Sequence, residues 1–274
     1  MAKNGAGTDG YSAPAVERAF RLLDAVAGAV EAPTLSELAR KLGFSKSTTH
    51  GLVHALIAAD ALTQDPGSKR LLLGPAVVEL ALKNREVFLL GDQAQPLLED
   101  LRDRIDESVF FGMMIRFRTL VMAAAEARKS MKISALPGTA IPLLAGAVGK
   151  VLLAQMSSDQ TRETIRRLTL PRFTPASIVD EQRFLTEVQK VRKRGVAVDC
   201  GEYLSGVNAV AVGLGKRRGI PLVVWAVGFA ESLGPEKISV VVNELVKTGR
   251  ALQDRLGPLS EKWDFAASGP VAGV

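Results

Sequence analysis

Cysteine, histidine and aromatic residues are scarce in this sequence of 274 residues. Cys200 is the single cysteine, so the chain forms no internal disulfide and no structural zinc site built from several thiolates. Its two histidines are His50 and His54, so a metal site elsewhere in the chain would depend on carboxylates. Aromatic residues make up only 5%. The core must therefore consist mainly of Ala, Val, Leu and Ile.

The sequence also lacks a targeting signal and a membrane-spanning run. Residues 1–10 are polar and glycine-rich, without the basic and apolar regions of a secretory signal. The longest uncharged window, residues 133–149, is shorter than the ~20 residues that a transmembrane helix requires, and it contains proline. We expect a cytoplasmic protein with no membrane partner.

Length and charge set the remaining limits. The chain is longer than a typical domain of ~150 residues, so we expect two domains. Hydrophobic residues make up 47% and charged residues 23%, which is typical of globular proteins with a buried core. The net charge of +6 is compatible with an anionic partner, although charge alone does not establish one.

The clearest local pattern is a pair of short helices separated by a glycine. Thr34 and Glu37 form a capping box that begins a helix over residues 35–42. Gly43 is expected to end this helix in the left-handed conformation. Ser45 then caps a third helix that reaches about residue 59. Two short helices joined by a tight turn predict a helix-turn-helix.

A helix and a hairpin flank this motif. Apolar residues at helical spacing predict a first helix from residue 14 to residue 28. Two strands, 62–65 and 69–73, are predicted on either side of a Pro-Gly-Ser turn. The hairpin would form a wing with Lys69 and Arg70 near its tip.

The third helix is predicted to have two contrasting faces. The inward positions are Thr49, Leu52, Val53 and Leu56. The outward positions are Lys46, Ser47, His50, Gly51 and His54. A basic face with hydroxyl groups suits the DNA major groove. A solvated face of a packing module is the alternative, because residues 1–75 carry a net charge of only +1. The absence of acidic residues from Leu38 to Ala59 favours DNA.

The two histidines have the spacing of metal ligands, since they are four residues apart on one helical face. A zinc site needs three or four ligands, and neither a glutamate between them nor a nearby thiolate is present. We therefore predict no metal and no cofactor, and interpret His50 and His54 as surface residues near DNA.

Five stretches carry a resemblance to a known family: APAVERAFRLLDAVA, TLSELARKLGFSKSTTHGLVHALIAADAL, KRLLLGPAVVELA, PLLAGAVGKVLLA and RGVAVDCGEYLSGVNAVAVGL. They occur in that family's order and span most of the chain from about Ala13 to Leu256. Together they are highly specific. On these residues the chain resembles the IclR-type bacterial transcriptional regulators.

The resemblance implies an α+β protein with an N-terminal winged helix-turn-helix, a linker helix and a GAF-like α/β effector-binding domain with a central antiparallel sheet. It also implies binding to double-stranded operator DNA as a homodimer or a dimer of dimers, with repression or activation controlled by a small-molecule effector. The expected segments are a disordered tail (1–11), the DNA-binding domain (12–74), the linker helix (75–90), the effector-binding domain (91–258) and a flexible tail (259–274).

The DNA-binding residues expected from the local pattern and the resemblance are Arg18, Ser45, Lys46, Ser47, Thr48, His50, His54, Lys69 and Arg70. The chain departs from the family's usual pattern at two positions. Gly51 stands where a recognition-helix arginine is common, and Ala15 replaces a common serine before the first helix's acidic-Arg pair. One DNA contact typical of the family is thus missing, and we expect a different operator sequence.

The C-terminal two thirds alternate between helical and strand-like patterns. The expected helices after the one beginning at Pro75 are 94–105, 147–156, 159–168, 180–194 and 235–256. The expected strands are 109–115, 120–124, 196–199, 207–214 and 222–229. This order fits an antiparallel sheet flanked by helices.

Little in this part of the chain indicates catalysis. Residues 146–150 superficially resemble a phosphate-binding loop, but Val151 stands where that loop needs Ser or Thr. No histidine follows residue 54, so a Ser-His-Asp arrangement is impossible there. Asp199 and Glu202 remain a possible acid-base pair. An enzyme with a GAF-like domain is therefore an alternative, and a scaffold whose winged domain binds protein is another.

The resemblance places an effector pocket along the loop before residue 147 and along the last strands. The residues carried over by position are Leu144, Gly146, Ala147, Asp199, Ala209, Ala226 and Gly228. Free amides of Gly146 and Ala147 would bind an anionic group. Several positions where the family has hydroxyl or imidazole groups are apolar in this chain, and each unmet polar group of a ligand costs roughly 1–3 kcal/mol. We therefore expect a semi-apolar or aromatic effector.

Overall fold

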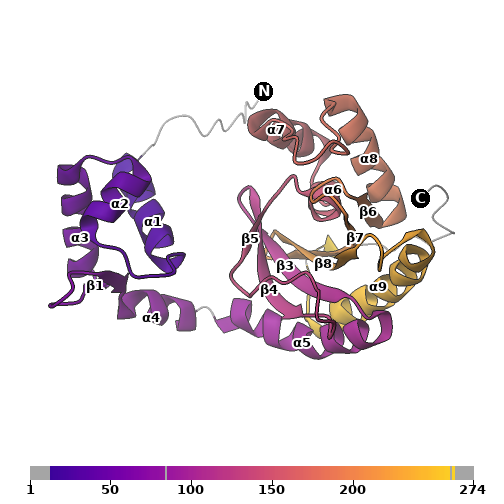
Figure 1. Cartoon of the computed structure of the whole chain (residues 1–274), viewed down its shortest axis with the longest axis horizontal. Helices are drawn as coiled ribbons and strands as arrows, with labels where there is room; N and C mark the ends of the chain where they lie inside the picture. The colour runs from indigo at the N-terminus through magenta and orange to yellow at the C-terminus, as the bar shows by residue number, and fades with distance from the viewer. Residues whose placement is uncertain (1–12, 84, 260, 263–274) are drawn as a thin grey trace, which may run out of the picture. The chain divides into compact units, whose positions relative to one another are not determined.

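The structure, a computed structural model, describes residues 13–83, 85–259 and 261–262 (Figure 1). The chain forms two compact units, Met1–Arg85 and Glu86–Val274. The expected disordered tail and residues 263–274 of the expected flexible tail lie outside the described residues. Among the helices that the structure describes, none is long and apolar enough to cross a membrane.

The N-terminal unit contains the predicted winged helix-turn-helix. Its elements are α1 (Pro14–Ala27), α2 (Leu35–Leu42), α3 (Lys46–Ala58), β1 (Leu62–Gln64), β2 (Leu71–Leu73) and α4 (Pro75–Lys83). The strands β1 and β2 pair antiparallel to form the hairpin. Leucine and valine side chains from the helices and the hairpin meet in one small core: Leu22, Leu38, Val53, Leu62 and Leu71.

The predicted caps of this unit are confirmed. The Glu37 carboxylate accepts a hydrogen bond from the Thr34 amide at 2.7 Å, and the Thr34 hydroxyl accepts one from the Glu37 amide at 3.4 Å. Gly43 ends α2 with φ of 68°. The Ser45 hydroxyl accepts from the Thr48 amide at 3.1 Å and begins α3. These local signals fix where the two helices of the motif begin and end.

The C-terminal unit is built on one antiparallel sheet with the strand order β5-β4-β3-β8-β7-β6, to which β9 adds by pairing with β7. The strands are β3 (Ser108–Ile115), β4 (Arg118–Ala125), β5 (Ala140–Pro142), β6 (Val196–Cys200), β7 (Val207–Arg217), β8 (Ile220–Phe229) and β9 (Glu261–Lys262). The predicted central antiparallel sheet is therefore confirmed. The short strands β5 and β9 were not predicted.

Helices cover both faces of this sheet (Figure 1). They are α5 (Arg85–Ile105), α6 (Gly146–Ala154), α7 (Ser158–Leu168), α8 (Glu181–Arg194) and α9 (Pro235–Arg255). One core joins α5 and α9 to one face of the sheet. A second core joins α6, α7 and α8 to the other face. The central strands are thus buried on both sides.

Two segments differ from their expected form. The expected linker helix (75–90) corresponds to α4 followed by the beginning of α5, which starts at Arg85 rather than at residue 94 and contains Pro96. Glu261 and Lys262 lie in the expected flexible tail, yet they form β9 by pairing with Lys216 and Gly215. Backbone pairing to the free edge of β7 orders these two residues, and their side-chain pattern gives no sign of it.

Residues of β7 and β8 alternate between the two cores, because successive side chains of a strand point to opposite faces. Val224 and Ala226 belong to the core with α5 and α9. Trp225 and Val227 belong to the core with α6 and α8. The face on which each residue lies decides which residues can contact a ligand between the sheet and α6.

Two glycines of the N-terminal unit should respond oppositely to alanine. A Cβ at Gly74 would lie 2.1 Å from the carbonyl oxygen of Asp60, so Gly74→Ala should destabilise the unit by more than about 1 kcal/mol. Gly51 lies in α3 with no atom within 4 Å of a new Cβ, so Gly51→Ala should stabilise it by about 0.5–1 kcal/mol. Urea unfolding measures both, and equal effects would contradict the packing at Gly74.

Candidate nucleic-acid interface and ligand cavity

The outer face of α3 is exposed in the way that the sequence predicts. Thr49 and Val53 are buried against the rest of the unit. The exposed residues of the opposite face are Lys46, Ser47, His50, Gly51 and His54. The face therefore combines one amine, a hydroxyl and two imidazoles, and it carries no carboxylate.

Hydroxyl groups gather at the beginning of α3. The Ser45 hydroxyl donates to the Thr48 hydroxyl at 2.8 Å and lies 3.0 Å from the Ser47 hydroxyl. Arg18 is exposed on α1, and Lys69 is exposed on the hairpin turn with φ of 57°. These side chains are accessible to a phosphate or a base edge.

Arg70 differs from the other predicted DNA contacts because its guanidinium group is used within the unit. It donates a hydrogen bond to the carbonyl of Ala32 and lies 3.6 Å from the Glu31 carboxylate. Thr34 and Arg70 also form an isolated backbone bridge. Arg70 therefore ties the wing to the segment before α2, a role that the sequence pattern did not indicate.

The two histidines of α3 stack on each other, with ring centroids 6.4 Å apart and ring planes 23° apart. In the part of the chain that the structure describes, no group of three His, Cys, Asp or Glu side chains is placed to hold a metal ion. The pair is thus an exposed feature of the α3 face rather than part of a larger ligand set.

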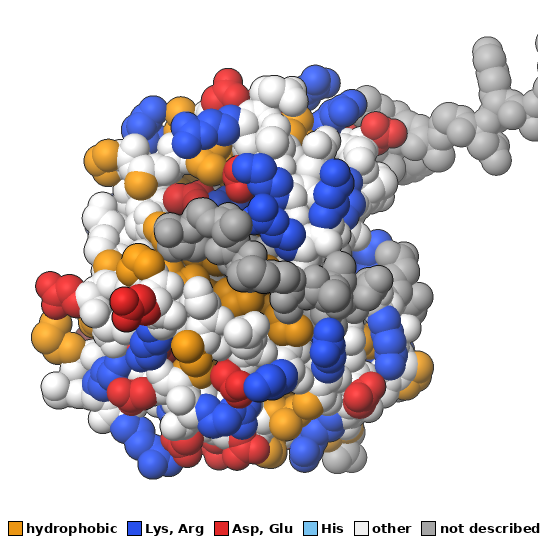
Figure 2. Space-filling model, turned by 90° about the vertical axis from the view of Figure 1, so that its right-hand side faces the viewer, with side chains coloured by type: hydrophobic (Ala, Val, Ile, Leu, Met, Phe, Trp, Pro, Cys, Tyr) orange, Lys and Arg blue, Asp and Glu red, His pale blue; other side chains and the backbone are white. Residues whose placement is uncertain are grey.

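The positive charge of the chain is not concentrated in this unit. Residues 1–75 contribute +1 of the net +6. On the C-terminal unit, Figure 2 shows Lys and Arg side chains over the upper part of the face where α8 lies, interspersed with Asp and Glu. The local composition of the α3 face, and not the overall charge of the unit, therefore indicates a nucleic-acid interface.

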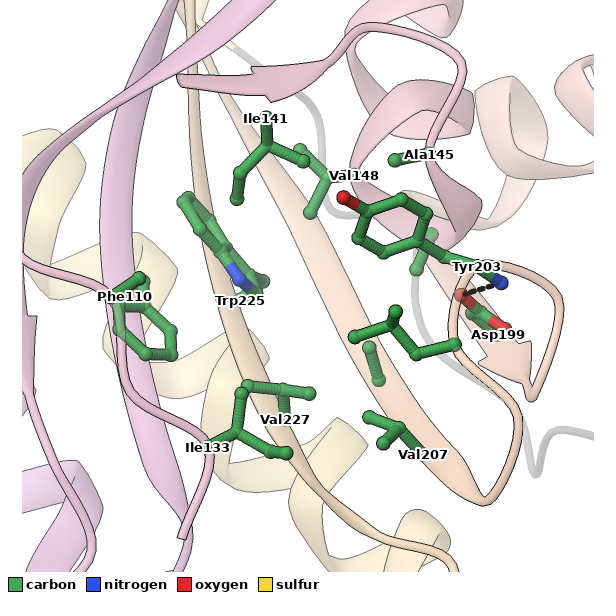
Figure 3. Close-up of a pocket in the computed structure, with 14 residues that line it drawn as sticks. Phe110, Ile133, Ile141, Ala145, Val148, Asp199, Tyr203, Val207, Trp225 and Val227 are labelled. Carbon is green, nitrogen blue, oxygen red and sulfur yellow. Dashed lines mark hydrogen bonds between the residues drawn. The ribbon is translucent and has the colours of Figure 1, made fainter. Parts of the chain in front are cut away.

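The C-terminal unit contains a small, partly open cavity of about 80 Å³ between the sheet, α6 and the loop 201–206 (Figure 3). Its lining residues are Phe110, Ile133, Ala135, Ile141, Ala145, Ala147, Val148, Asp199, Tyr203, Leu204, Val207, Ala209, Trp225 and Val227. Polar side-chain atoms in this lining come from Asp199, Tyr203 and Trp225. Phe110 and Trp225 stack with centroids 5.4 Å apart. The cavity is mostly apolar.

Three of the seven predicted effector-site residues line this cavity: Ala147, Asp199 and Ala209. Leu144 and Gly146 border a separate hollow of about 10 Å³ that also contacts Phe184. Neither residue is among those that line the cavity beside Asp199, so the expected effector residues are divided between two hollows.

Ala226 and Gly228 also lie outside this cavity. Ala226 packs in the core with α5 and α9, and the Cα of Gly228 faces the Glu107 carboxylate. A shift of one residue along a strand moves a side chain to the opposite face, so these two positions are one residue away from those of β8 that border the cavity. Trp225 and Val227 occupy the expected places instead.

Sequence reasoning missed the aromatic walls, Phe110, Tyr203 and Trp225. Phe110 and Trp225 come from adjacent strands, where they form a cross-strand pair. Tyr203 comes from the loop 201–206, and Figure 3 shows its ring facing the cavity with the hydroxyl directed toward Val148. Three of the chain's few aromatic residues thus gather at one cavity, and their rarity in the sequence is the only sign of a shared role.

Asp199 is the only acidic residue of the lining, and its side chain is almost completely buried, with 3% of the residue exposed. Its carboxylate oxygens accept hydrogen bonds from the Glu202 amide at 2.5 Å and the Tyr203 amide at 3.3 Å. Burial raises the pKa of Asp199 to about 6, and the Glu202 carboxylate contributes in the same direction. The two amides and the Lys150 ammonium oppose this rise.

The loop 201–206 is held on several sides. The Glu202 carboxylate forms an ion pair with the buried Lys150 ammonium. The Glu202 carbonyl accepts hydrogen bonds from Ser177 at 2.7 Å and from Thr174 at 3.2 Å. Gly201 and Gly206 bound the loop, each with φ of 75°. Asp199 therefore fastens the loop that carries the cavity residue Tyr203.

The stability of the protein should depend on pH through Asp199. Because its folded-state pKa of about 6 is above the ordinary aspartate value, the folded state takes up this proton first as the pH falls. The free energy of unfolding of the wild type should therefore rise relative to Asp199→Asn by about 1 kcal/mol between pH 7.5 and pH 5. Urea unfolding of both proteins at both pH values measures this difference. A constant or opposite difference would contradict the buried, ionisable state of Asp199.

Both units match known protein families. Residues 15–66 match the family described as "IclR helix-turn-helix domain", and residues 81–252 match "Bacterial transcriptional regulator IclR C-terminal". The chain is 25% identical over 257 residues to the "HTH-type transcriptional regulator BhcR" of Paracoccus denitrificans, which covers 92% of this chain and 90% of that protein. It is 27% identical over 249 residues to the "HTH-type transcriptional repressor AllR" of Escherichia coli, which covers 89% of this chain and 91% of that protein.

Solved structures agree with this match. An IclR-type transcriptional regulator from Alicyclobacillus acidocaldarius superposes with a TM-score of 0.74 at 25% identity, covering 90% of this chain and 100% of that one. A transcriptional regulator from Silicibacter superposes with a TM-score of 0.77 at 22% identity, covering 89% of this chain and 96% of that one. This likeness shows a shared fold. The chain belongs to the IclR family of bacterial transcriptional regulators.

Proposed function

We propose that this protein binds a specific operator DNA through α3 and the wing, and that a small molecule in the C-terminal cavity controls this binding. The observation that carries the proposal is the mostly apolar cavity in a unit that follows a helix-turn-helix on the same chain. The names of the curated relatives favour a regulator over an enzyme. The cavity supports a ligand site, and α3 supports a DNA-reading element.

The residues best placed for DNA lie at the beginning of α3, along its exposed face, on α1 and on the wing. Lys46 and Ser47 lie in the first turn of α3, where a recognition helix contacts base edges and phosphates. His50 and His54 continue the same face. Arg18 and Lys69, together with the hydroxyls of Ser45 and Thr48, would contact the backbone, whereas Arg70 would act mainly by positioning the wing.

Removal of one phosphate-binding lysine should weaken DNA binding in a salt-dependent manner. Lys46→Ala should lower operator affinity and reduce the slope of log affinity against log salt by about one. Lys69→Ala should weaken binding to all sequences about equally. Lys247→Ala is the control, because Lys247 lies on α9 and pairs with Glu244. Fluorescence anisotropy at several salt concentrations measures these values. If neither Lys46→Ala nor Lys69→Ala changes the operator affinity, DNA does not bind to this face of α3 and the wing.

The N-terminal unit exposes several large apolar side chains on α4 and α1. The helix α4 has no buried residue, although it is largely apolar. Val78, Leu80 and Leu82 on α4 are 57%, 69% and 61% exposed, and Phe20 on α1 is 69% exposed. A nine-residue helix is not stable in isolation and needs packing on an apolar face. We infer that a second copy of the chain covers this surface, which gives a homodimer with two recognition helices.

A charge on α4 should dissociate this dimer. Leu80→Glu should shift the protein from dimer toward monomer, because the carboxylate would be buried without a partner in the interface. Lys83→Gln is the control, since Lys83 is exposed on the same helix. Sedimentation velocity at several concentrations measures the association. A dimer that remains equally stable after Leu80→Glu would place the interface elsewhere.

The walls of the cavity favour a semi-apolar or aromatic effector. Phe110, Trp225 and Tyr203 offer ring faces and edges, and Ile133 and Ile141 add aliphatic surface. A solved structure with the same fold is titled an IclR homologue complexed with 4-hydroxybenzoate, from Microbacterium hydrocarbonoxydans. At 20% identity that structure shows the fold alone, so the effector class is argued from the lining of this chain.

A ring-sized effector would require the cavity to widen. Its volume of about 80 Å³ is smaller than the roughly 150 Å³ cavity that accommodates benzene in an engineered protein. Most of the walls belong to the sheet and α6, whereas Tyr203 and Leu204 belong to the loop 201–206. Leu204 is 45% exposed. Displacement of a wall segment outside the sheet and α6 would admit a ligand, and for the loop 201–206 it would break the contacts to Asp199 and Lys150.

A further inference from the structure

The polar end of the cavity is formed by the Asp199 carboxylate. Each of its oxygens accepts one backbone hydrogen bond, from Glu202 and from Tyr203. A carboxylate oxygen has two acceptor positions, so acceptor capacity remains on a side chain that lines the cavity. A ligand that donates a hydrogen bond can therefore use Asp199, and a ligand that only accepts cannot.

The carboxylate also occupies the place where an anionic ligand would be expected. A Cβ built on Gly146, the first residue of α6, would lie 1.8 Å from the Asp199 Oδ2 atom. The side chain thus sits against the first turn of α6, whose positive dipole end attracts negative charge. The chain thus places its own carboxylate beside this helix end, where its charge would repel an anionic ligand.

The rest of the lining gives a carboxylate ligand no positive charge. None of the fourteen described lining residues is Lys, Arg or His. Lys150 is buried close by, but its ammonium is paired with the Glu202 carboxylate. The Tyr203 hydroxyl and the Trp225 indole are neutral. An incoming carboxylate would meet the Asp199 charge without compensation, in an apolar surrounding where such repulsion is strong.

From this arrangement, and resting on the proposed role of the cavity as the effector site, we propose that the effector presents a hydroxyl or ammonium group to Asp199 and that the cavity rejects a carboxylate at that position. The ligand class is a small ring-bearing alcohol, phenol or amine. The aromatic walls hold the ring, and Asp199 selects the polar substituent by its charge and by its need for a donor.

Three probes that share one ring test this selectivity: benzyl alcohol, benzylamine and benzoate. Isothermal titration calorimetry with the full-length protein at pH 7.5 should give affinities for the alcohol and the amine at least tenfold higher than for benzoate. Benzoate binding as tightly as either donor would overturn the proposal. Failure of all three probes to bind at millimolar concentration would also overturn it, because the cavity would then not accept a ring with a donor.

Variants assign the selectivity to this residue. Asp199→Asn keeps the size of the side chain, removes its charge and adds a donor, so the preference over benzoate should fall to less than about threefold. Glu163→Gln, on the exposed face of α7, is the control and should keep the wild-type ratio. Ala209→Leu fills the cavity from β7 and should weaken the alcohol and the amine at least tenfold. An unchanged ratio in Asp199→Asn, or unchanged binding in Ala209→Leu, contradicts the assignment.

The same preparations are titrated with the promoter DNA flanking the gene of this protein. If the protein binds its promoter DNA but prefers benzoate to the alcohol and the amine, the proposed selectivity of Asp199 is wrong and the proposed function stands. Loss of sequence-specific DNA binding in the wild type would defeat the proposed function instead. If Asp199→Asn does not fold, as judged by circular dichroism, the ranking of the three probes on the wild type decides.

Discussion

Burial of the central sheet on both faces is the constraint on which the C-terminal unit depends. One face packs against α5 and α9 and the other against α6, α7 and α8, so β8 and residues 209–214 of β7 consist of apolar residues and glycine. Side-chain alternation then divides each strand between two cores. The face toward α6 carries large aromatic residues, Phe110 and Trp225, and leaves the cavity between them and the first turn of α6.

A buried carboxylate connects this cavity to the surrounding loops. Asp199 lies at the end of β6, against Gly146 of α6, and accepts the amides that shape the loop 201–206. Gly146 has a positive φ of 47° and no space for a side chain, so helix and carboxylate fit together only with glycine at this position. The same side chain therefore lines the cavity and holds the loop that carries Tyr203.

Signals that are local in sequence were sufficient to predict most of the elements. The capping box at Thr34 and the glycine at position 43 define α2, and Gly195 ends α8 in the left-handed conformation as its position after a basic turn suggests. The exposed face of α3 also follows from helical spacing alone. The strand β9 and the anchoring of Arg70 depend on contacts distant in sequence, which no local pattern encodes.

The ligand site was harder to predict, for a physical reason. A strand with one solvated face alternates between apolar and polar residues, and that alternation reveals which side chains point inward. In β8 both faces are buried, so the residue pattern of the strand does not show which face borders the cavity, and Ala226 and Gly228 were named by the resemblance alone. Asp199, Ala147 and Ala209, which the resemblance also named, do line the cavity.

We propose that this family member recognises a specific DNA sequence, and a titration with promoter DNA tests that specificity. Fluorescence anisotropy at moderate salt measures the affinity for the promoter DNA flanking its own gene. The affinity for scrambled DNA of the same length and composition is measured in the same way. The account predicts an affinity for the promoter at least about a thousandfold higher, as is typical of specific over non-specific binding. Equal affinity for the two duplexes would contradict it.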